Sequence, residues 1–339
     1  MAAIDITESP ARADFVQFAE GFGPRFLVTI DAEEEFDWAA PIDRHSHTIE
    51  TIPAMGRFQQ FCEGFGVAPV YLLDQPVAAA PATKAVLGEA VAAGRAEVGV
   101  QLHPWVSPPF NEEVIPHNTY AGNLPPALER AKFMHLRDTI ESAFGTAPLI
   151  YRAGRYGTGP ATAEILADGG IAFDTSVRAC FDYSAGGGPN YRSHPLRPYW
   201  LDRARRLIEL PLTTVFWGPL RRQGEALYPR LWRIPRLRGA LARLGLLERI
   251  ALTPEGIGAE AALRAIDIAL DDGLPLLVFS FHSPSLAPGH TPYVRTEADL
   301  DAFYDWWRTI FARLEQRGVR PTSVAQLTRA VLASPGPAS

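Results

Sequence analysis

The sequence predicts an α/β protein whose parallel sheet closes into a single barrel domain. Short apolar runs of strand length recur along its 339 residues, with longer amphipathic segments between them. Polar side chains that suit catalysis follow several of these runs directly. The runs indicate about seven strands, at residues 26–30, 67–73, 97–102, 149–151, 171–173, 207–210 and 276–281.

The segments between the runs are predicted to be helices. They place apolar residues at intervals of three and four, which is typical of helices with one buried face. Repeated alternation of strand and helix favours a parallel sheet. The predicted helices cover residues 48–65, 124–144, 160–168, 259–271 and 296–316.

The residue after each run supports the barrel and locates its site. Because the carboxyl ends of the strands in a closed parallel barrel converge on one rim, side chains from distant parts of the sequence meet there. The residues at these positions are Asp31, Asp74, His103, Arg152, Asp174 and His282.

An arginine-rich segment, residues 211–254, interrupts the alternation of predicted strands and helices. It holds eight arginines between Arg221 and Arg249, against Glu225 and Glu248. One interpretation is an arginine-faced helix that packs on the barrel. The other is a lid, or a surface for peripheral contact with a membrane or a lipid-linked glycan. We predict a barrel domain over residues 26–330 that contains this segment, an N-terminal extension at 1–25 and a disordered tail at 331–339.

Composition narrows the class of partner. A formal charge of −6 argues against nucleic-acid binding, which favours a basic surface. The first 25 residues lack the basic and apolar regions of a secretory signal, and no run reaches the roughly 18 apolar residues of a membrane span. Cys62 and Cys180 are expected to be free thiols in a reducing compartment. We therefore expect a cytoplasmic protein, and the sequence leaves its oligomeric state open.

Two carboxylates just past the first strand, Asp31 and Glu33, are candidates for a base and a metal ligand. Hydrolysis of an unactivated amide needs both, and neighbouring carboxylates can divide the roles because their surroundings separate their pKa values. The alternative is that Asp31 caps a turn and the following glutamates form a solvated acidic loop.

Three further segments carry candidate groups. His103 ends a strand beside Trp105, which suits a metal ligand next to a sugar-stacking face. The run that begins at Arg152 and includes Arg155 and Tyr156 can hold a carboxylate and supply backbone N–H groups to an oxyanion, although an ion pair that closes the barrel would also explain it. His282 ends the last strand, where it can protonate a leaving amine.

These segments, in this order, resemble the motifs of the polysaccharide deacetylase family, the NodB-like carbohydrate esterases. The resemblance covers residues 26–327 and is strongest to the subgroup associated with bacterial surface-polysaccharide biosynthesis. It implies a distorted (β/α)7 barrel. It also implies Asp31 as base, Arg152 as its partner and His282 as acid, with Glu33 and His103 on a divalent metal ion, expected to be zinc, and Trp105, Arg155 and Tyr156 on the carbohydrate substrate.

One departure concerns the metal. The family supplies two histidines four residues apart, where this sequence has Gln101 and Trp105 with His103 between them. The third ligand then comes from His45, His47 or Asp74, or Gln101 ligates weakly, or the metal has been lost.

The expected function is metal-dependent removal of an N-acetyl group from an amino sugar in a surface-polysaccharide or glycan intermediate. Two alternatives stay open. One is a catalytically inactive carbohydrate-binding barrel, which Gln101 favours. The other is a glycoside hydrolase that uses two carboxylates, Asp31 with Glu33 or Glu35.

Overall fold

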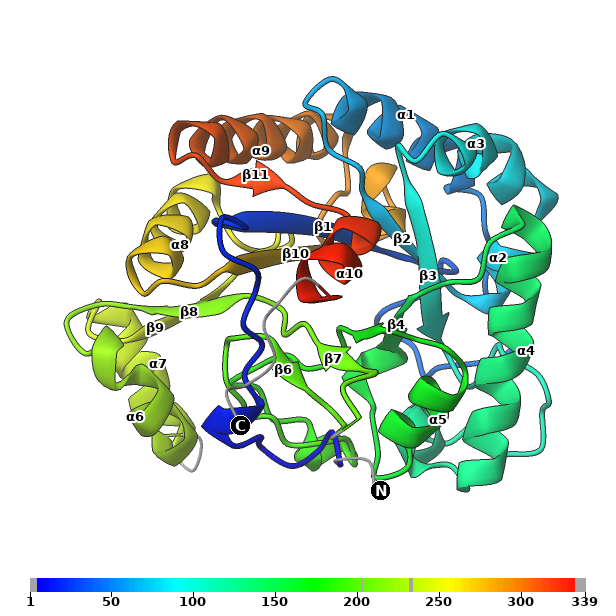
Figure 1. Cartoon of the computed structure of the whole chain (residues 1–339), viewed down its shortest axis with the longest axis horizontal. Helices are drawn as coiled ribbons and strands as arrows, with labels where there is room; N and C mark the ends of the chain where they lie inside the picture. The colour runs from blue at the N-terminus through cyan, green and yellow to red at the C-terminus, as the bar shows by residue number, and fades with distance from the viewer. Residues whose placement is uncertain (1–4, 203, 232–233, 333–339) are drawn as a thin grey trace.

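The computed structural model describes residues 5–202, 204–231 and 234–332. Its main sheet has nine strands in the order β10-β1-β2-β3-β4-β5-β7-β6, and β11 pairs with β1 (Figure 1). A separate hairpin joins β8 to β9. The strands are β1 (Arg25–Ala32), β2 (Val70–Leu73), β3 (Glu97–Leu102), β4 (Ile150–Ala153), β5 (Phe173–Asp174), β6 (Tyr199–Trp200), β7 (Ile208–Glu209), β8 (Thr214–Trp217), β9 (Glu248–Ala251), β10 (Leu276–His282) and β11 (Arg320–Pro321).

The predicted α/β barrel is confirmed in a distorted form. The seven predicted runs are the seven consecutive parallel strands from β10 to β7, and β6 adds an antiparallel edge. In the described chain no ladder joins β7 to β10. The segment after β7 bridges this gap instead, because the Thr213 N–H donates to Val278 and the Leu212 N–H donates to Val177. The sheet is therefore a curled half-barrel with an irregular seam.

Helices cover the outside of the sheet. Four of the five predicted helices end within two residues of their predicted limits, whereas α1 is shorter at both ends. The prediction missed α3, whose alanine-rich sequence gives little contrast between its faces, and it also missed α2 and α10. The helices are α1 (Ile52–Glu63), α2 (Gln75–Ala79), α3 (Pro81–Ala92), α4 (Pro126–Phe144), α5 (Thr162–Asp168), α6 (Gly224–Leu231), α7 (Pro235–Arg243), α8 (Ala259–Asp271), α9 (Glu297–Gln316) and α10 (Val324–Leu332).

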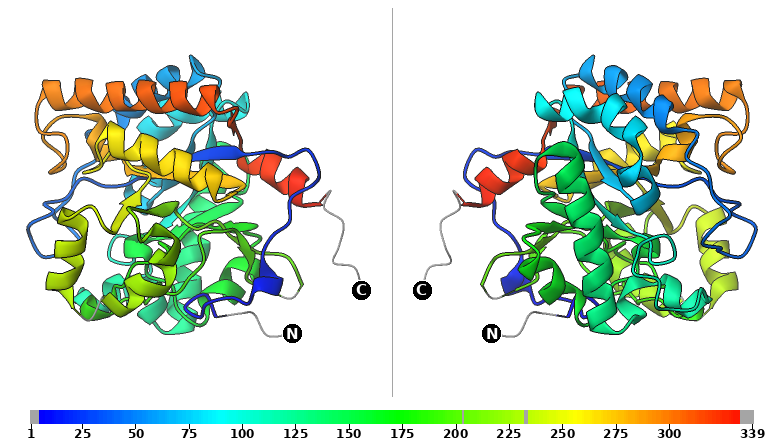
Figure 2. Two further views of the ribbon diagram at one scale, coloured as in Figure 1. Left: turned by 90° about the vertical axis from the view of Figure 1, so that its left-hand side faces the viewer. Right: turned by 90° about the vertical axis from the view of Figure 1, so that its right-hand side faces the viewer.

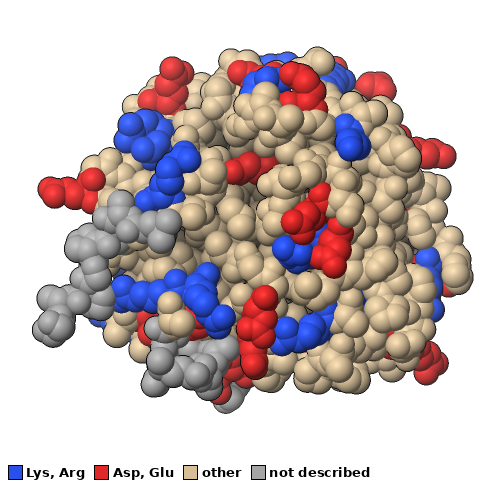
Figure 3. All heavy atoms as spheres, turned by 45° about the vertical axis from the view of Figure 1, so that its right-hand side comes forward, with Lys and Arg blue, Asp and Glu red and all other residues tan. Residues whose placement is uncertain are grey.

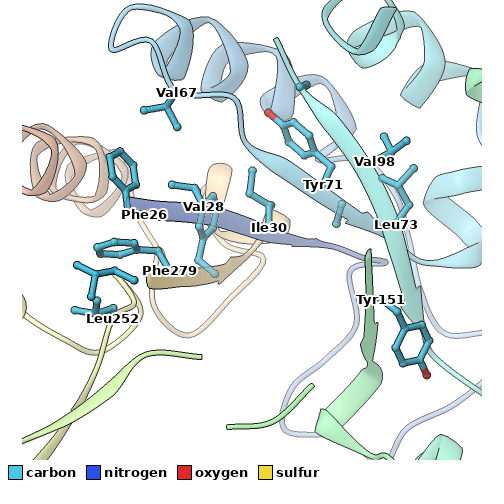
Figure 4. Close-up of a cluster of buried hydrophobic side chains, with 14 of the residues drawn as sticks. Phe26, Val28, Ile30, Val67, Tyr71, Leu73, Val98, Tyr151, Leu252 and Phe279 are labelled. Carbon is cyan, nitrogen blue, oxygen red and sulfur yellow. The ribbon is translucent and has the colours of Figure 1, made fainter. Parts of the chain in front are cut away.

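Alternation along the strands separates two buried layers. Phe26, Val28 and Ile30 of β1 belong to the cluster between sheet and helices, part of which Figure 4 shows. Leu27 belongs instead to the inner cluster of the barrel, and Thr29 and Asp31 continue its face because residues two apart in a strand share a face. The inner face of β1 thus runs from apolar to charged along the chain.

The amino ends of the strands are closed by α10. Its Val324 and Leu327 pack in the inner cluster, and the carboxylate of Glu97 accepts hydrogen bonds from the N–H groups of Val324 and Ala325, at 2.5 and 2.9 Å. Figure 2 shows α10 on one side of the molecule and the blue loop that follows β1 on the opposite side. The open end of the barrel is therefore the end where the strands finish.

The arginine-rich segment forms the β8–β9 hairpin with α6 and α7 between its strands. On α7, Arg236 and Arg243 are exposed. Of the predicted tail, residues 331 and 332 belong to α10, and the rest lies outside the described residues. Before β1, the Val16 N–H donates to Pro198, which ties the N-terminal segment to the edge of the sheet.

The charged surface is mixed in sign. On the face drawn in Figure 3, basic and acidic side chains lie in small groups among uncharged ones. None of the described helices has both the length and the apolar sequence that crossing a bilayer requires.

Candidate active site

The carboxyl ends of the strands surround a cavity of about 470 Å³. All eight residues that the sequence predicted for the site line this cavity, and Gln101 lines it with them. They come from β1, β3, β4 and β10 and from the turns that follow these strands. The eight are Asp31, Glu33, His103, Trp105, Arg152, Arg155, Tyr156 and His282.

Arg152 fixes Asp31 at the floor of the cavity. Its guanidinium is fully buried, forms an ion pair with the Asp31 carboxylate and donates to the Ser280 hydroxyl at 2.9 Å. It also donates to the Thr29 hydroxyl and the Thr175 carbonyl, at 2.8 and 3.0 Å. One side chain of β4 thus reaches β1, β10 and the end of β5, so the geometry of Asp31 depends on four strands at once.

His282 lies beside Asp31, and Glu255 binds the ring nitrogen that is turned away from Asp31. Its Nδ1 lies 2.7 Å from a carboxylate oxygen of Glu255, while its Nε2 lies 3.8 Å from Asp31 Oδ2. Burial by itself lowers the pKa of His282, but the charges of Glu255, Glu33 and Asp31 outweigh it and raise the pKa to about 10. The neighbouring carboxylates therefore favour the protonated imidazole, whose Nε2 lies close to the base.

Two acidic residues support His103. Its Nδ1 lies 2.8 Å from Glu34 Oε2, and the other Glu34 oxygen accepts a hydrogen bond from the indole N–H of Trp105 at 2.8 Å. Asp74 caps α2 through the Val77 N–H and accepts from the Glu34 N–H at 2.7 Å. This chain of bonds directs His103 Nε2 toward Glu33, whose Oε2 lies 3.5 Å away.

Glu33 is a buried carboxylate at the same place. Burial raises the pKa of Glu33 to about 8, although His282 and His103 act in the opposite direction. Gln101 Nε2 donates to Glu33 Oε2 at 3.0 Å, and Gln101 Oε1 is buried without a hydrogen-bond partner in the described structure. A cation beside Glu33 would favour its ionised form and would give the orphaned amide oxygen a partner.

These groups fit a metal ion. His103 Nε2 and the Glu33 carboxylate are the available ligands, with Gln101 Oε1 as a weak third. Glu34, Asp74 and His103 also form a compact group in which each ligand atom lies within 4.8 Å of the others. Glu34 and Asp74, however, already accept hydrogen bonds at every carboxylate oxygen, so we interpret them as the acidic support that orients a ligating histidine.

Several expectations for individual residues are wrong in this structure. His45 and His47 line a second cavity, of about 720 Å³, and neither belongs to the group of possible ligands around His103 in the described part of the chain. Asp174 is not among the residues that line the cavity; it lies fully buried beside Glu209, and burial raises the pKa of both carboxylates. Glu35 is not part of a solvated acidic loop, since its carboxylate accepts hydrogen bonds from the N–H groups of Glu50 and Thr51.

Trp105 is not free to stack on a sugar. Only 3% of its surface is exposed, and its ring stacks on His103 with centroids 4.3 Å apart. Trp38 and Tyr293 supply the open aromatic surface instead, with 36% and 41% exposed, and Trp38 meets the His282 ring edge-on at 5.0 Å. Both side chains line the cavity.

The turn after β4 brings its groups close to His103. Arg155 and Tyr156 both have left-handed backbone, with φ of 54° and 59°. Gly154 is required there, because a Cβ atom at this position would lie 2.2 Å from His103 Cδ2. The turn therefore packs directly against the candidate ligand.

Sequence reasoning missed five residues of this site: Glu34, Glu255, Trp38, Tyr293 and Arg178. Glu34 lies in the acidic run for which a solvated loop was the alternative interpretation, although its position after a buried strand was a usable signal. Glu255 follows β9, which is not one of the seven predicted strands. The remaining three lie in loops, where periodicity gives no signal.

The chain matches no family model and no curated protein. Among solved structures it is similar to the Puue allantoinase, with 15% identity, a TM-score of 0.51 and 93% of both chains covered. It is also similar to a Mycobacterium smegmatis protein described as a polysaccharide deacetylase, with 19% identity, a TM-score of 0.48 and 93% and 98% covered. A third is the family 4 acetyl xylan esterase of Clostridium thermocellum, solved with cobalt, with 13% identity, a TM-score of 0.43 and 90% of each chain covered.

At these identities the likeness concerns the fold alone. The allantoinase match covers 93% of both chains, so the fold predicted from the sequence is one that a solved structure shares. The neighbours with lower TM-scores are named as polysaccharide deacetylases and carbohydrate esterases.

Proposed function

We propose that this protein is a metal-dependent hydrolase that removes the N-acetyl group from an amino sugar. One observation carries the proposal: the Asp31 carboxylate and the His282 imidazole face each other, with Asp31 Oδ2 3.8 Å from His282 Nε2. Each is held by its own buried partner, Arg152 or Glu255. A base and an acid with separate supports can act in turn on a single amide.

Asp31 and His282 divide the proton transfers. Asp31 takes a proton from the water whose oxygen attacks the acetamide carbon, and Arg152 keeps that carboxylate aimed at the water. The C–N bond then breaks, and His282 Nε2–H gives its proton to the departing nitrogen, so that acetate and a free amine are released. The bond between His282 Nδ1 and Glu255 keeps the acidic proton on Nε2.

His103 and Glu33 would hold the metal ion, with Gln101 beside them. When bound, such an ion polarises the carbonyl oxygen and lowers the pKa of water. Backbone N–H groups in the turn at Arg155 and Tyr156 are the candidates for holding the oxyanion. We expect zinc, because one imidazole and one carboxylate are common zinc ligands.

The sugar belongs against the aromatic side chains of the rim. Trp38 and Tyr293 present open ring surfaces, and Tyr156 lines the inner wall. Aromatic faces of this kind stack on sugar rings. The proposed substrate class is an amino sugar of a surface-polysaccharide or glycan intermediate, as the motif resemblance implies.

A carbohydrate-binding barrel without hydrolysis is the second candidate, and Gln101 favours it. Where a second imidazole would strengthen the ligand set, Gln101 donates a hydrogen bond to Glu33. This arrangement keeps Glu33 in place whether or not a metal is bound. If the protein ligands hold the metal ion too weakly, the protein is expected to bind the sugar without hydrolysing it.

Product analysis tests the proposal. The full-length protein is incubated with zinc or cobalt and a panel of N-acetylated sugars, and acetate, free amine and new reducing ends are measured. Equal amounts of acetate and amine support deacetylation. New reducing ends without acetate would indicate a glycosidase, and saturable sugar binding without either product would indicate a binding protein.

A further inference from the structure

One cation in the cavity has no part in the proposed chemistry. Arg178 follows β5, lines the cavity and lies over two aromatic rings, with its Cζ 4.0 Å from the Phe181 centroid and 5.5 Å from that of Tyr156. Within the described chain, no acidic side chain forms an ion pair with it. By contrast, the deeper Arg152 is paired with Asp31.

A second arginine on the same wall is also without a counter-ion. Arg155 is exposed, donates to the Thr119 hydroxyl and lies over the Tyr120 ring at 4.3 Å. No carboxylate of the described residues pairs with it. The acidic lining residues, Asp31 and Glu33, contact Arg152, His282, Gln101 and His103 instead.

Contact with aromatic rings does not use the hydrogen-bond donors of these guanidinium groups. A ring contacts the flat face of a guanidinium, whereas the five N–H donors point outward in its plane. Two guanidiniums that line one partly enclosed cavity without a carboxylate partner among the described residues attract an anion that can accept paired hydrogen bonds. Phosphate and carboxylate groups are anions of this kind.

We infer that the substrate sugar carries an anionic group, a phosphate or a carboxylate, and that Arg155 and Arg178 form its subsite. Both residues belong to the turns after β4 and β5, next to the strand that supplies Arg152. The anion would therefore lie on the wall formed by these turns, while the acetamide lies toward β1, β3 and β10. This placement rests on the proposed function, whereas the anion site itself rests only on the two arginines.

Calorimetric titration with sugars that lack an acetamide tests the subsite without turnover. The probes are glucose 1-phosphate, glucuronic acid and glucose, and the protein is the full chain. We expect at least one anionic probe to bind more tightly than glucose, and the preferred probe identifies phosphate or carboxylate as the source of the charge. Arg178→Gln should weaken that binding about tenfold or more, as expected for the loss of charge-assisted hydrogen bonds.

Matched variants separate the subsite from general charge effects. Arg221→Gln removes an arginine that pairs with Asp272 at 3.0 Å outside the cavity, and it should leave the binding unchanged. Arg155→Gln should also weaken binding, and because Arg155 is exposed this variant carries the test if Arg178→Gln melts at a lower temperature. Arg178→Lys keeps the charge but loses the planar fork, so it should give an intermediate affinity.

Two results would overturn the inference. One is equal affinity for glucose and both anionic probes. The other is an anion affinity that Arg155→Gln and Arg178→Gln leave unchanged. Either result leaves the proposed deacetylation standing if acetate is still released from neutral sugars. Conversely, anion binding without acetate release from any N-acetylated sugar would retain the subsite and reject the deacetylase.

Discussion

The two halves of the sheet are built differently, and the candidate chemistry follows that difference. Strands β10, β1, β2, β3 and β4 are four to eight residues long, whereas β5, β7 and β6 have two residues each. The long strands carry Asp31, His103, Arg152 and His282 at their ends. The short strands are followed by loops that carry Arg178, which no carboxylate of the described residues pairs with, and several aromatic residues.

Register explains why the long strands can hold precise geometry. Asp31 pairs with His282 across the β1–β10 ladder, and Gln101 pairs with Arg152 across the β3–β4 ladder. Because both ladders are continuous and buried, these side chains enter the barrel in fixed positions. Groups that transfer protons need this precision, whereas loops that recognise a substrate can differ between proteins on the same scaffold.

The largest expected effect is that of Asp31→Asn, which tests whether the long-stranded half carries the chemistry. We expect acetate release to fall more than about 100-fold, because the variant lacks a base. It also leaves the buried Arg152 without its anion, so the free energy of unfolding should fall by roughly 3 kcal/mol. Both quantities are measured at 20 °C. The control is Asp37→Asn, because Asp37 is an exposed residue of the second cavity, and this variant should keep both its activity and its stability.

His103→Ala tests the metal ligand in the same half. We expect zinc affinity to fall by about 100-fold or more and activity to fall with it. The variant removes the imidazole ligand, and Glu34 then no longer acts on the metal through it. Titration with zinc measures the effect. His45→Ala is the control, because His45 lies in the second cavity. Full zinc occupancy with normal turnover in His103→Ala would make His103 a structural residue.

Glu255→Gln tests the support of a catalytic group in the long-stranded half, because Glu255 follows the separate β8–β9 hairpin and holds His282 of β10. The folded pKa of His282, about 10, lies above its ordinary 6.5. The ion pair therefore stabilises the fold fully below about pH 6.5, and this contribution is lost as the pH rises toward 10. In the metal-free protein, the variant should be less stable by roughly 1–3 kcal/mol at pH 6, with a smaller difference at pH 10. Urea unfolding that shows the same difference at both pH values would contradict this coupling.

The smallest expected effect is a gain. Gln101→His adds an imidazole beside Glu33 and His103, where Gln101 already lies 3.0 Å from the Glu33 carboxylate. Zinc should bind about tenfold more tightly, because nitrogen replaces a weak amide ligand. Zinc titration of the variant and the wild type decides this. Unchanged affinity would mean that position 101 does not face the ion.

The sequence predicted the strands well because they are buried on both faces and therefore form continuous apolar runs. Asp31, His103, Arg152 and His282 could be placed together for the same reason, since each follows such a run. Glu34 and Glu255 could not be placed in the site from the sequence. Their roles come from contacts with Nδ1 of His103 and of His282, and these contacts form only in the folded protein. The misplacement of His45 and His47 has the same origin: the path of the loop after β1 follows from long-range bonds to Glu35, not from local pattern.

Kinetics of two variants on one substrate compare the halves most directly. The substrate is an anionic N-acetylated sugar that the wild type hydrolyses, and the variants are Asp31→Asn and Arg178→Gln. We expect Asp31→Asn to lower kcat more than about 100-fold with KM nearly unchanged, and Arg178→Gln to raise KM about tenfold while kcat stays within about threefold. If Arg178→Gln lowered kcat as strongly as Asp31→Asn, or if Asp31→Asn changed KM alone, the division between a catalytic half and a recognition half would be contradicted.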